Sequence, residues 1–587
     1  MTRKEYDAEL EARGRQFLEP VARSAASLWG AHAILAMGGD PQRVAEIIQA
    51  RLGSRPAGPF GRVATGTFDV LAAMTLICRW GDLLPEPAHA RVREALTRGI
   101  LHRGNTENHW LMHYAGTLLA TERWPDVEVW GNGLSREATR AEATRWILGM
   151  IDRTARLGHY EYDSTQYHPC HLLSMIALTD HARDPRLRAL AGRMATLYVA
   201  DMALEYFHGA WAGGHSREGY RQNTWTLVGA SASLGFYYFG DAPFDPEVHR
   251  DEMACPAMTA RFRPPPLLAD LARDRSKPRV VKKTKAPRAI YRHADREARP
   301  VRKYTYLSPS FALGSTQVNL PGAPAGPIDL VSWDLSWAGP KHQATLVCGH
   351  PCLSPGRFSA FLSGLPQAIG RAVAAPKPYL QNPDRLFGAS PYERMMQHES
   401  ALLVLYRIPP EDPAPYVNLY LPKAVAWTER EGWVLGDAGA FYVGLRPVGD
   451  CRWQEIWEEG HLDGYLIRVE GRDVGLALEA EEARSVGTFD NFCEEMVSPR
   501  LDLSGWPEPG RVRFETLGGH ELELIYDGPH RVDGTEIDYA SWPLYEAPGV
   551  EAPPGAGRIL FCLKGERLEL DFEVDPSRPM LPMRVIG

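Results

Sequence analysis

Residues 158–173 read GHYEYDSTQYHPCHLL and gather phenol, imidazole and carboxylate side chains beside an apolar run. Pro169 marks a helix start, because proline is favoured at the first helical position and pushes the preceding residue out of the α region. Apolar residues at 172, 173, 176 and 177 follow helical spacing, so we predict a helix over residues 169–182. Tyr167 then lies near a positive helix end, where a phenolate is favoured. The stretch therefore predicts a helix and a site for a Brønsted catalyst.

Helical patterns fill the first 250 residues on both sides of this stretch. Amphipathic segments are separated by short turns that contain Gly or Pro. The predicted helices cover residues 10–37, 63–79, 91–100, 106–121, 135–157, 169–182, 185–207 and 217–239. Helices joined in this way favour stacked helical hairpins, and the lack of a visible repeat favours a curved toroid over a regular solenoid.

After residue 304 the pattern changes to short segments rich in β-branched and aromatic residues. Gly, Pro and Asp separate them, which is typical of antiparallel sheets in a sandwich. They cover residues 401–408, 416–421, 432–435, 440–445, 465–469, 512–516, 522–526 and 558–563. We therefore predict an α+β protein with a helical domain over residues 1–250 and an antiparallel β-sheet domain over residues 304–587.

The segment between these two domains is strongly basic. Residues 273–303 contain thirteen Lys or Arg and three Asp or Glu. Charge blocks are commonly flexible connectors, so we interpret residues 251–303 as a basic, proline-containing linker. The alternative is a basic lip that attracts an acidic polymer.

Composition narrows the class of protein and its location. The formal net charge of −8 gives no reason to expect nucleic-acid binding. The sequence has no apolar run long enough to span a bilayer and no secretory pattern at its start, so we expect a cytoplasmic protein that does not enter a membrane. Eight cysteines in this length do not make a disulfide scaffold. No P-loop or dinucleotide-binding fingerprint is present, and we expect no cofactor.

A second stretch, NTENHWLMHY over residues 105–114, carries an adjacent Asn and His. Thr106 is a candidate N-cap, and the residues at 111, 112, 115, 118 and 119 form the buried stripe of a helix. Asn108 and His109 lie off that stripe, near the helix start. Their structural alternative is to hydrogen-bond neighbouring turns.

Taken together, the Asn-His pair and the acidic-aromatic segment ending in Tyr-His resemble the (α/α)-toroid polysaccharide lyases, in particular the heparinase II/III and alginate lyase group. The resemblance implies a helical toroid followed by antiparallel sheets, with the cleft where they meet. It also implies that Asn108 and His109 are the family's Asn-His pair and that Tyr167 is its tyrosine acid. Asp163 is followed by Ser164, whereas the family often has Asp-Gly there. The helical half is short, which implies an incomplete toroid.

The chemistry of that family suits these residue types. In β-elimination the proton α to a uronate carboxylate is removed and the glycosidic oxygen is expelled, so the carboxylate charge must be neutralised, here by Asn108 and His109. Tyr167 would protonate the leaving oxygen, and Tyr167, His109 or a residue of the β domain would be the base. The resemblance implies a further His or Tyr from the β half, for which His398 is the candidate. Alternatively, His398 closes a strand edge.

Other polar residues are candidates for binding an acidic sugar. Tyr162 and His168 belong to the first stretch, and His215, Arg217 and Tyr220 belong to the segment GGHSREGYRQN over residues 213–223. An arginine can hold a carboxylate through two hydrogen bonds.

Two Cys/His clusters raise the question of zinc. Cys170 lies between His168 and His171, and residues 348–352 read CGHPC. Zinc sites normally need two separated ligand pairs, and neither cluster has a second pair, so no metal site is predicted.

The sequence therefore predicts a lyase that cleaves an oligosaccharide or polysaccharide containing uronic acid. A glycoside hydrolase on a similar toroid is the alternative, with Glu107, Glu161 and Asp163 as its acid and base carboxylates. A third possibility is a carbohydrate-binding protein without catalysis, since a fold does not establish a function. The sugar, its linkage and the oligomeric state stay open.

Overall fold

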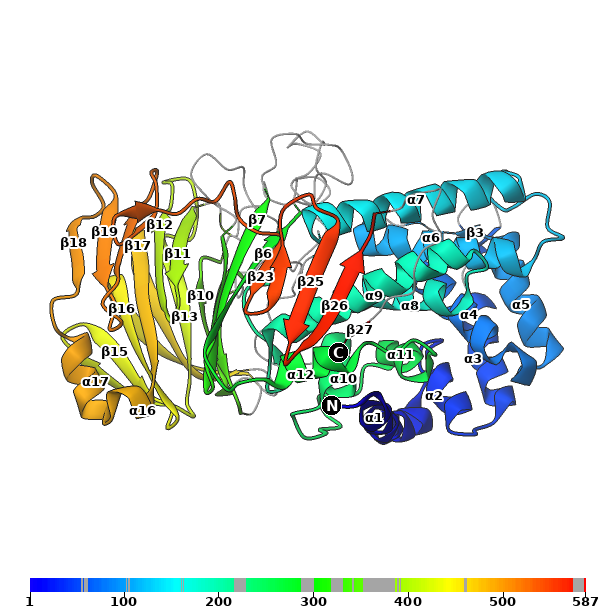
Figure 1. The fold of residues 1–587 in the computed structure, drawn as a ribbon, viewed down its shortest axis with the longest axis horizontal. Helices are drawn as coiled ribbons and strands as arrows, with labels where there is room; N and C mark the ends of the chain where they lie inside the picture. The colour runs from blue at the N-terminus through cyan, green and yellow to red at the C-terminus, as the bar shows by residue number, and fades with distance from the viewer. Residues whose placement is uncertain are drawn as a thin grey trace.

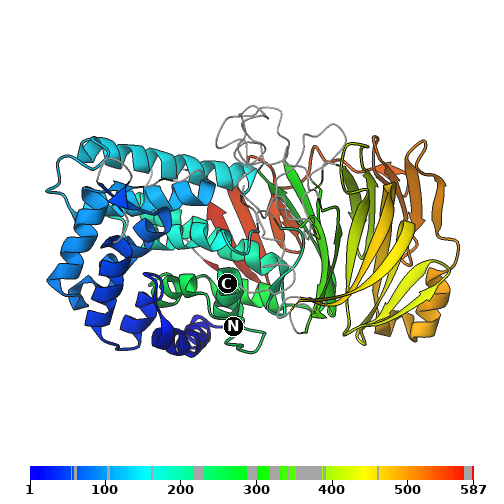
Figure 2. The ribbon, with the colours of Figure 1, turned by 180° about the vertical axis from the view of Figure 1, so that it is seen from behind.

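The computed structural model describes residues 1–53, 56–57, 62–101, 103, 106–159, 161, 163–215, 229–286, 300–317, 331–339, 343–351, 386–387, 390, 392–458, 462–573 and 585–586. Most of its helices precede large antiparallel sheets in the chain, which confirms the α+β class (Figure 1). Seen from behind in Figure 2, the helices lie at one end of the molecule and the sheets at the other.

The N-terminal part is built from helices that match most of the predicted ones within a few residues. Their bounds are α1 Arg3–Ser24, α2 Ala31–Ala36, α3 Pro41–Gly53, α4 Thr67–Trp80, α5 Glu86–Thr97, α6 Glu107–Arg123, α7 Arg136–Leu157, α8 His168–His181, α9 Pro185–Glu205, α10 Ala230–Phe239, α11 Cys255–Thr259 and α12 Pro266–Arg273. The Thr106 side chain accepts a hydrogen bond from the His109 backbone N–H, so Thr106 is the predicted N-cap of α6. Helix α8 starts one residue before the predicted position.

Short strands accompany the helices, and longer strands follow them. Those of the helical part are β1 Pro56–Ala57, β2 Arg62–Thr65, β3 Ile100–Leu101, β4 Tyr206–Phe207 and β5 Ala210–Trp211. The first large sheet contains β6 Arg279–Lys285, β7 Val301–Leu307, β8 Phe311–Gln317, β9 Trp333–Trp337, β23 Tyr545–Ala547, β24 Val550–Ala552, β25 Arg558–Leu563, β26 Glu566–Asp571 and β27 Val585–Ile586. Neighbouring strands in this sheet run antiparallel, and β6 lies between β23 and β7.

The second large sheet is reached through β10 (Thr345–Gly349), which pairs with β9 on one side and β13 on the other. Its further strands are β11 Glu393–His398, β12 Ala401–Arg407, β13 Tyr416–Pro422, β14 Ala426–Arg430, β15 Trp433–Asp437, β16 Phe441–Glu458 and β17 Leu462–Glu482. The long strand β17 pairs with β16 along one edge and with β13 and then β12 along the other. A small sheet with α17 (Phe489–Met496) follows, made of β18 Leu501–Gly505, β19 Arg511–Glu515, β20 Glu521–Ile525, β21 Arg531–Val532 and β22 Thr535–Glu536.

These elements pack as successive layers. The helical core continues into the first sheet, where Val281, Tyr545 and Phe561 belong to the same buried cluster as the helices. A second cluster joins the first sheet to the second, and a third joins the second sheet to the small sheet and α17. Figure 1 shows β6, β7, β23 and β25 between the helices and the other sheet. The junction between helices and first sheet is therefore a packed interior.

The linker predicted over residues 251–303 differs from the structure. Residues 255–285 contain α11, α12 and β6, and β7 begins at Val301. Lys283, Lys285 and Lys303 are buried. Their charges are matched by carboxylates from the helical part of the chain, as described below. A count of charge within the segment cannot detect partners that lie elsewhere in the sequence. Residues 287–299 lie outside the described part of the chain.

Within the described residues, no helix combines the length and the apolar character that crossing a membrane requires.

Candidate functional site

The two stretches singled out in the sequence meet at the junction of helices and sheet through a buried hydrogen-bond network. Glu161 accepts hydrogen bonds from the Asn108 backbone N–H at 2.8 Å and from Asn108 Nδ2 at 2.9 and 2.7 Å. His171 Nε2 lies 3.1 Å from the same carboxylate. The network ties the start of α6 to the first turn of α8.

All three members of this network are fully buried. The amide hydrogens of Asn108 already point at Glu161, so they are not directed at a substrate in this arrangement. Asn108 therefore positions the start of α6, as its structural alternative suggested. It also fixes His109, the next residue, at the first turn of the helix.

His109 and Tyr167 differ from their neighbours because both keep exposed surface. His109 is half-buried with its ring 5.4 Å from that of Phe68, and Tyr167 is half-buried as the N-cap residue of α8. In contrast, Glu107, Glu161 and Asp163 are at most 2% exposed. Among the described acidic and basic side chains of the two stretches, a ligand in solvent can reach His109, His113 and Tyr167 more readily than the carboxylates.

The sheet contributes three lysines to the same junction. Lys283 and Lys285 of β6 and Lys303 of β7 are fully buried, and they meet three buried carboxylates from the helical part, which are Asp163, Asp201 and Glu205. The charges of the two sets balance. A buried ion pair needs such matching, since an unpaired charge in the interior is very costly.

The shortest contacts show how tightly this cluster is connected. Lys283 Nζ lies 2.6 Å from Glu205 and 2.8 Å from Asp201, and Lys285 Nζ lies 2.5 Å from Asp201. Lys303 donates to Asp163 and, at 3.0 Å, to Glu205. These lysines bind the protein's own carboxylates. We refer to the six residues as the lysine–carboxylate cluster.

The ionisation of the cluster follows from these contacts. Burial alone would raise the pKa of Asp163, but the three lysines outweigh it and hold that pKa well below its ordinary value. The same balance lowers the pKa of Asp201 and of Glu205. For Lys283, burial works to lower the pKa, and the carboxylates raise it above its ordinary value. The three carboxylates and Lys283 are therefore charged near neutral pH.

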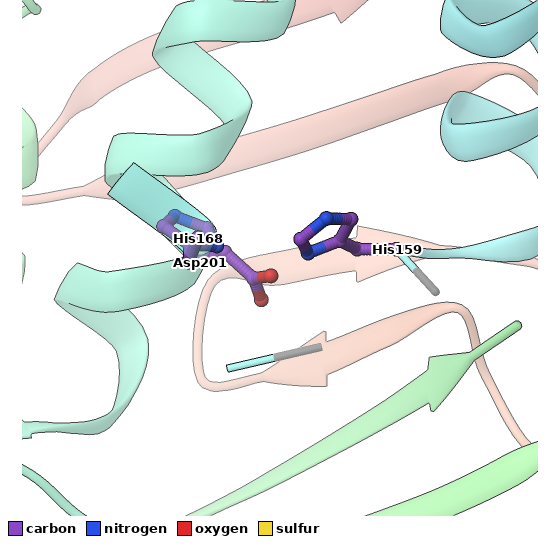
Figure 3. Close-up of side chains that lie close together, drawn as sticks. All are labelled: His159, His168 and Asp201. Atoms are coloured by element: carbon purple, nitrogen blue, oxygen red, sulfur yellow. The ribbon is translucent and has the colours of Figure 1, made fainter. Parts of the chain in front are cut away.

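His159, His168 and Asp201 offer ligand atoms within 4.8 Å of one another, and their side chains point toward a common centre in Figure 3. His168 Nε2 lies 3.0 Å from the Tyr198 carbonyl oxygen, to which it donates. Asp201, however, already accepts from Lys285 and another lysine. Two ammonium groups on this carboxylate disfavour a metal cation here.

Burial keeps these imidazoles neutral. It lowers the pKa of His168 to about 4 and the pKa of His159 well below its ordinary value. His168 is fully buried, so it supports the helix and the ring of Trp211, which lies 4.7 Å away, and its predicted contact with substrate has no exposed surface to act through.

His215 lies in a backbone bridge from the helical part to the sheet. Its N–H donates to the Val331 carbonyl at 2.8 Å, and its ring Nδ1 donates to the Asp163 carbonyl at 2.9 Å. The side chain is 2% exposed, and burial lowers its pKa to about 4. Two residues earlier, the Gly213 N–H donates to Asp334 at 2.6 Å. Burial raises the pKa of Asp334 to about 7.

The structure places His398 in a different environment. It ends β11 with its ring 4.7 Å from that of His520, which precedes β20. Lys282, whose charge acts on His398, lies over Trp542, while the adjacent Lys283 faces the helices. Lys282 and Lys283 are successive residues of β6, and successive strand residues point to opposite faces. Because Lys283 faces α9, Lys282 and the nearby His398 lie on the side of the first sheet away from α9. The described contacts do not bring it to the Asn108–Glu161–His171 network.

Some predicted residues cannot be placed, and others were not predicted. Tyr162, Arg217 and Tyr220 lie outside the described residues. Sequence reasoning missed Asp201 and Glu205, which look like ordinary polar positions four residues apart on α9. The available signal was the alternation in RVVKKTK, because Lys283 and Lys285 share one face of a strand.

No protein-family model matches the chain, and no curated protein does.

Proposed function

We propose that the protein is a polysaccharide or oligosaccharide lyase that cleaves a uronate-containing glycan by β-elimination. The helical part would be an incomplete (α/α) toroid and the sheets a β-sandwich, with the substrate held at the exposed surface of His109 and Tyr167. The observation that carries the proposal is the position of Tyr167. It is a half-buried tyrosine at the N-cap of α8, one turn before His171, which belongs to the buried network that anchors α6 and its His109.

This position suits proton transfer by a phenol. The partial positive charge of a helix N-terminus favours the phenolate, and a phenol with exposed surface can reach a substrate oxygen. In the proposed reaction Tyr167 protonates the leaving glycosidic oxygen. His109 neutralises the uronate carboxylate or removes the α proton, and Asn108 holds the helix that carries it.

The buried carboxylates argue against the hydrolase alternative. Glu161 is used by Asn108 and His171, and Asp163 is used by the lysines. A hydrolase needs an acid and a base at the scissile bond, with access to water. Neither carboxylate has exposed surface with which to act in this way.

The substrate would be an acidic oligosaccharide attacked from an end in the cytoplasm, without an organic cofactor. The lysines do not supply its binding charge, because they are paired with the protein's own carboxylates. The recognition of uronate would rest on hydrogen-bond donors around His109 and Tyr167.

The test is absorbance at about 235 nm, where the conjugated product of proton abstraction and elimination absorbs. Purified protein is mixed with oligosaccharides of alginate, glucuronan, heparin, chondroitin and hyaluronan. Tyr167→Phe should lower the rate about a hundredfold or more, the usual size of a general acid–base contribution. Tyr416→Phe is the matched control, since Tyr416 is also half-buried but lies on β13.

The other outcomes separate the alternatives. New reducing ends without absorbance would favour a hydrolase and reject the lyase. Binding of an oligosaccharide with neither product, unchanged by Tyr167→Phe, would favour the non-catalytic carbohydrate-binding protein.

A further inference from the structure

A cavity of about 190 Å³ lies on another side of α6, between the end of α5, β3 and the start of α7. Thr117 lines it, whereas Asn108 belongs to the buried network. The two residues are nine positions apart, and nine steps of about 100° amount to half a turn beyond two full turns. They therefore project from opposite faces of α6, and the cavity lies away from the Asn108–Glu161–His171 network.

Three buried polar groups line this cavity, and none has a hydrogen-bond partner among the described residues. They are the hydroxyls of Thr117 and Thr139 and the indole N–H of Trp130. Each of these residues is only 4% exposed. Buried polar groups in native proteins are nearly always paired with protein, water or ligand. Three unpartnered groups around one cavity indicate a polar occupant.

The rim of the cavity carries one charge of each sign. Arg103 donates to the Tyr114 hydroxyl at 3.1 Å, and that hydroxyl donates to Glu142 at 2.8 Å. The Arg103 guanidinium also lies 4.3 Å from the centre of the Trp110 ring, which restrains its position. Arg103 and Asn132 are exposed, so the cavity opens to solvent on their side.

The backbone that forms one wall is closely fitted. The Gly131 N–H donates to the Thr97 carbonyl at 2.8 Å. A Cβ at position 131 would lie 2.2 Å from the Gly99 carbonyl oxygen, so the loop approaches α5 as only glycine allows. Val129 and Ser135 form a β-bridge that closes the same loop. Trp130 is thus held in place from both sides.

We propose that this cavity binds a neutral polyhydroxylated molecule of monosaccharide size. The interior offers hydroxyls that donate or accept and an indole N–H that donates, which matches a ligand with several hydroxyl groups. Arg103 and Glu142 on the rim carry opposite charges. A ligand with a net charge would therefore be repelled by one of them. The volume equals that of about six waters, enough for one sugar ring. The rings of Tyr114 and Trp130 offer apolar surface to its C–H groups.

The proposal is tested by binding, without reference to turnover. Isothermal titration calorimetry and saturation-transfer NMR are run with glucose, galactose, mannose, xylose and myo-inositol, and with glucuronate and glycine as charged probes. At least one neutral probe should bind. Thr117→Val and Thr139→Val keep the shape but remove a hydroxyl, and each should raise the dissociation constant about tenfold.

Thr121→Val is the matched control. Thr121 lies one turn further along α6, is fully buried, and donates to the Leu118 carbonyl, outside the cavity. It should leave the dissociation constant unchanged. Trp130→Phe provides a second cavity variant that keeps an aromatic ring and removes the N–H. Thermal unfolding of every variant establishes that the fold is retained.

Three results would overturn the proposal. They are no binding of any neutral probe at millimolar concentration, binding that the cavity variants leave unchanged, and binding of the charged probes in preference to the neutral ones. None depends on whether the protein cleaves a glycan.

Discussion

Lys283 of β6 donates a hydrogen bond of 2.6 Å to Glu205, the last residue of α9, and neither side chain has exposed surface. The two residues are 78 positions apart in the chain. Their contact is one of several that fasten the first sheet to the helices at the level of residues 158–173. The candidate site therefore rests on a charged interior, and its geometry should depend on those charges.

Lys283→Met should lower the free energy of unfolding by about 3–5 kcal/mol, because it leaves buried carboxylates without their cation. The urea midpoint, followed by circular dichroism, measures this. Lys282→Met is the control. Lys282 points to the other face and forms a partly exposed pair with Glu546, so its loss should cost less than about 1 kcal/mol. Equal midpoints for the two variants would contradict the role of the cluster.

Stability should fall with pH from about 6.5 downward because of buried histidines. The folded pKa of His168 and that of His215 are both lowered to about 4 by burial. Because each folded pKa lies below the unfolded pKa, the stability that a buried neutral histidine contributes is complete above the unfolded pKa. It is lost as pH falls through the folded pKa. Urea midpoints measured between pH 8 and pH 4 should show this loss, and His168→Gln should reduce it. An identical pH profile for the variant would reject the assignment.

A second loss should follow at lower pH from the lysine–carboxylate cluster. The folded pKa values of Asp163, Asp201 and Glu205 are lowered, so their stabilisation is complete above the ordinary carboxyl value of about 4 and is lost below it. At the alkaline end, the raised pKa of Lys283 keeps its contribution complete up to its ordinary value of about 10.4, with loss above that. In the Lys283→Met protein the acid-side step should shrink.

A comparison of Asn108→Ala with His109→Ala should distinguish a residue that positions helix α6 from a residue that takes part in the proposed reaction. Asn108→Ala removes two hydrogen bonds to buried Glu161 and should cost about 1–3 kcal/mol of stability as well as activity. His109→Ala affects a half-buried residue and should lower activity while changing stability much less. Unfolding midpoints and the absorbance assay are measured on both. Retained activity in His109→Ala would remove this histidine from the proposed mechanism.

Asp334→Asn should stabilise the protein increasingly as pH rises from about 4 to 7. The folded pKa of Asp334 is raised to about 7, so its contribution is complete below the unfolded value of about 4 and is lost as pH rises through 7. The neutral amide avoids a buried charge and keeps an acceptor for the Gly213 N–H. The difference in urea midpoint between variant and wild type, measured across this range, should grow and then level off above pH 7. A constant difference would contradict the raised pKa.

The local elements were largely predictable from local patterns. Thr106 as N-cap and Pro169 as helix starter set the beginnings of α6 and α8, because capping and φ restriction act within a few residues. The segments that became β12, β13 and β25 were recognised by β-branched and aromatic runs. Helix α3 was not predicted.

The composition of the candidate site was only partly predictable. Asn108, Glu161 and His171 were all recognised as polar residues in two notable stretches, but their hydrogen-bond network depends on how α6 packs on α8. His398 was predicted because it precedes a strong β pattern. In the folded protein it lies on the side of the first sheet away from α9. A residue's face is set by register and layer order, which a short motif does not encode.

The sequence by itself determined that the chain is α+β, where helices α6 and α8 begin, and that residues 105–114 and 158–173 concentrate polar chemistry. The tertiary structure alone decided that three lysines of the basic segment would be interior. Lys283, Lys285 and Lys303 are stable there because carboxylates distant in the chain neutralise them. Burying these lysines depends on charges from several helices, strands and loops. The desolvation penalty is compensated only when all of the opposite charges are in contact.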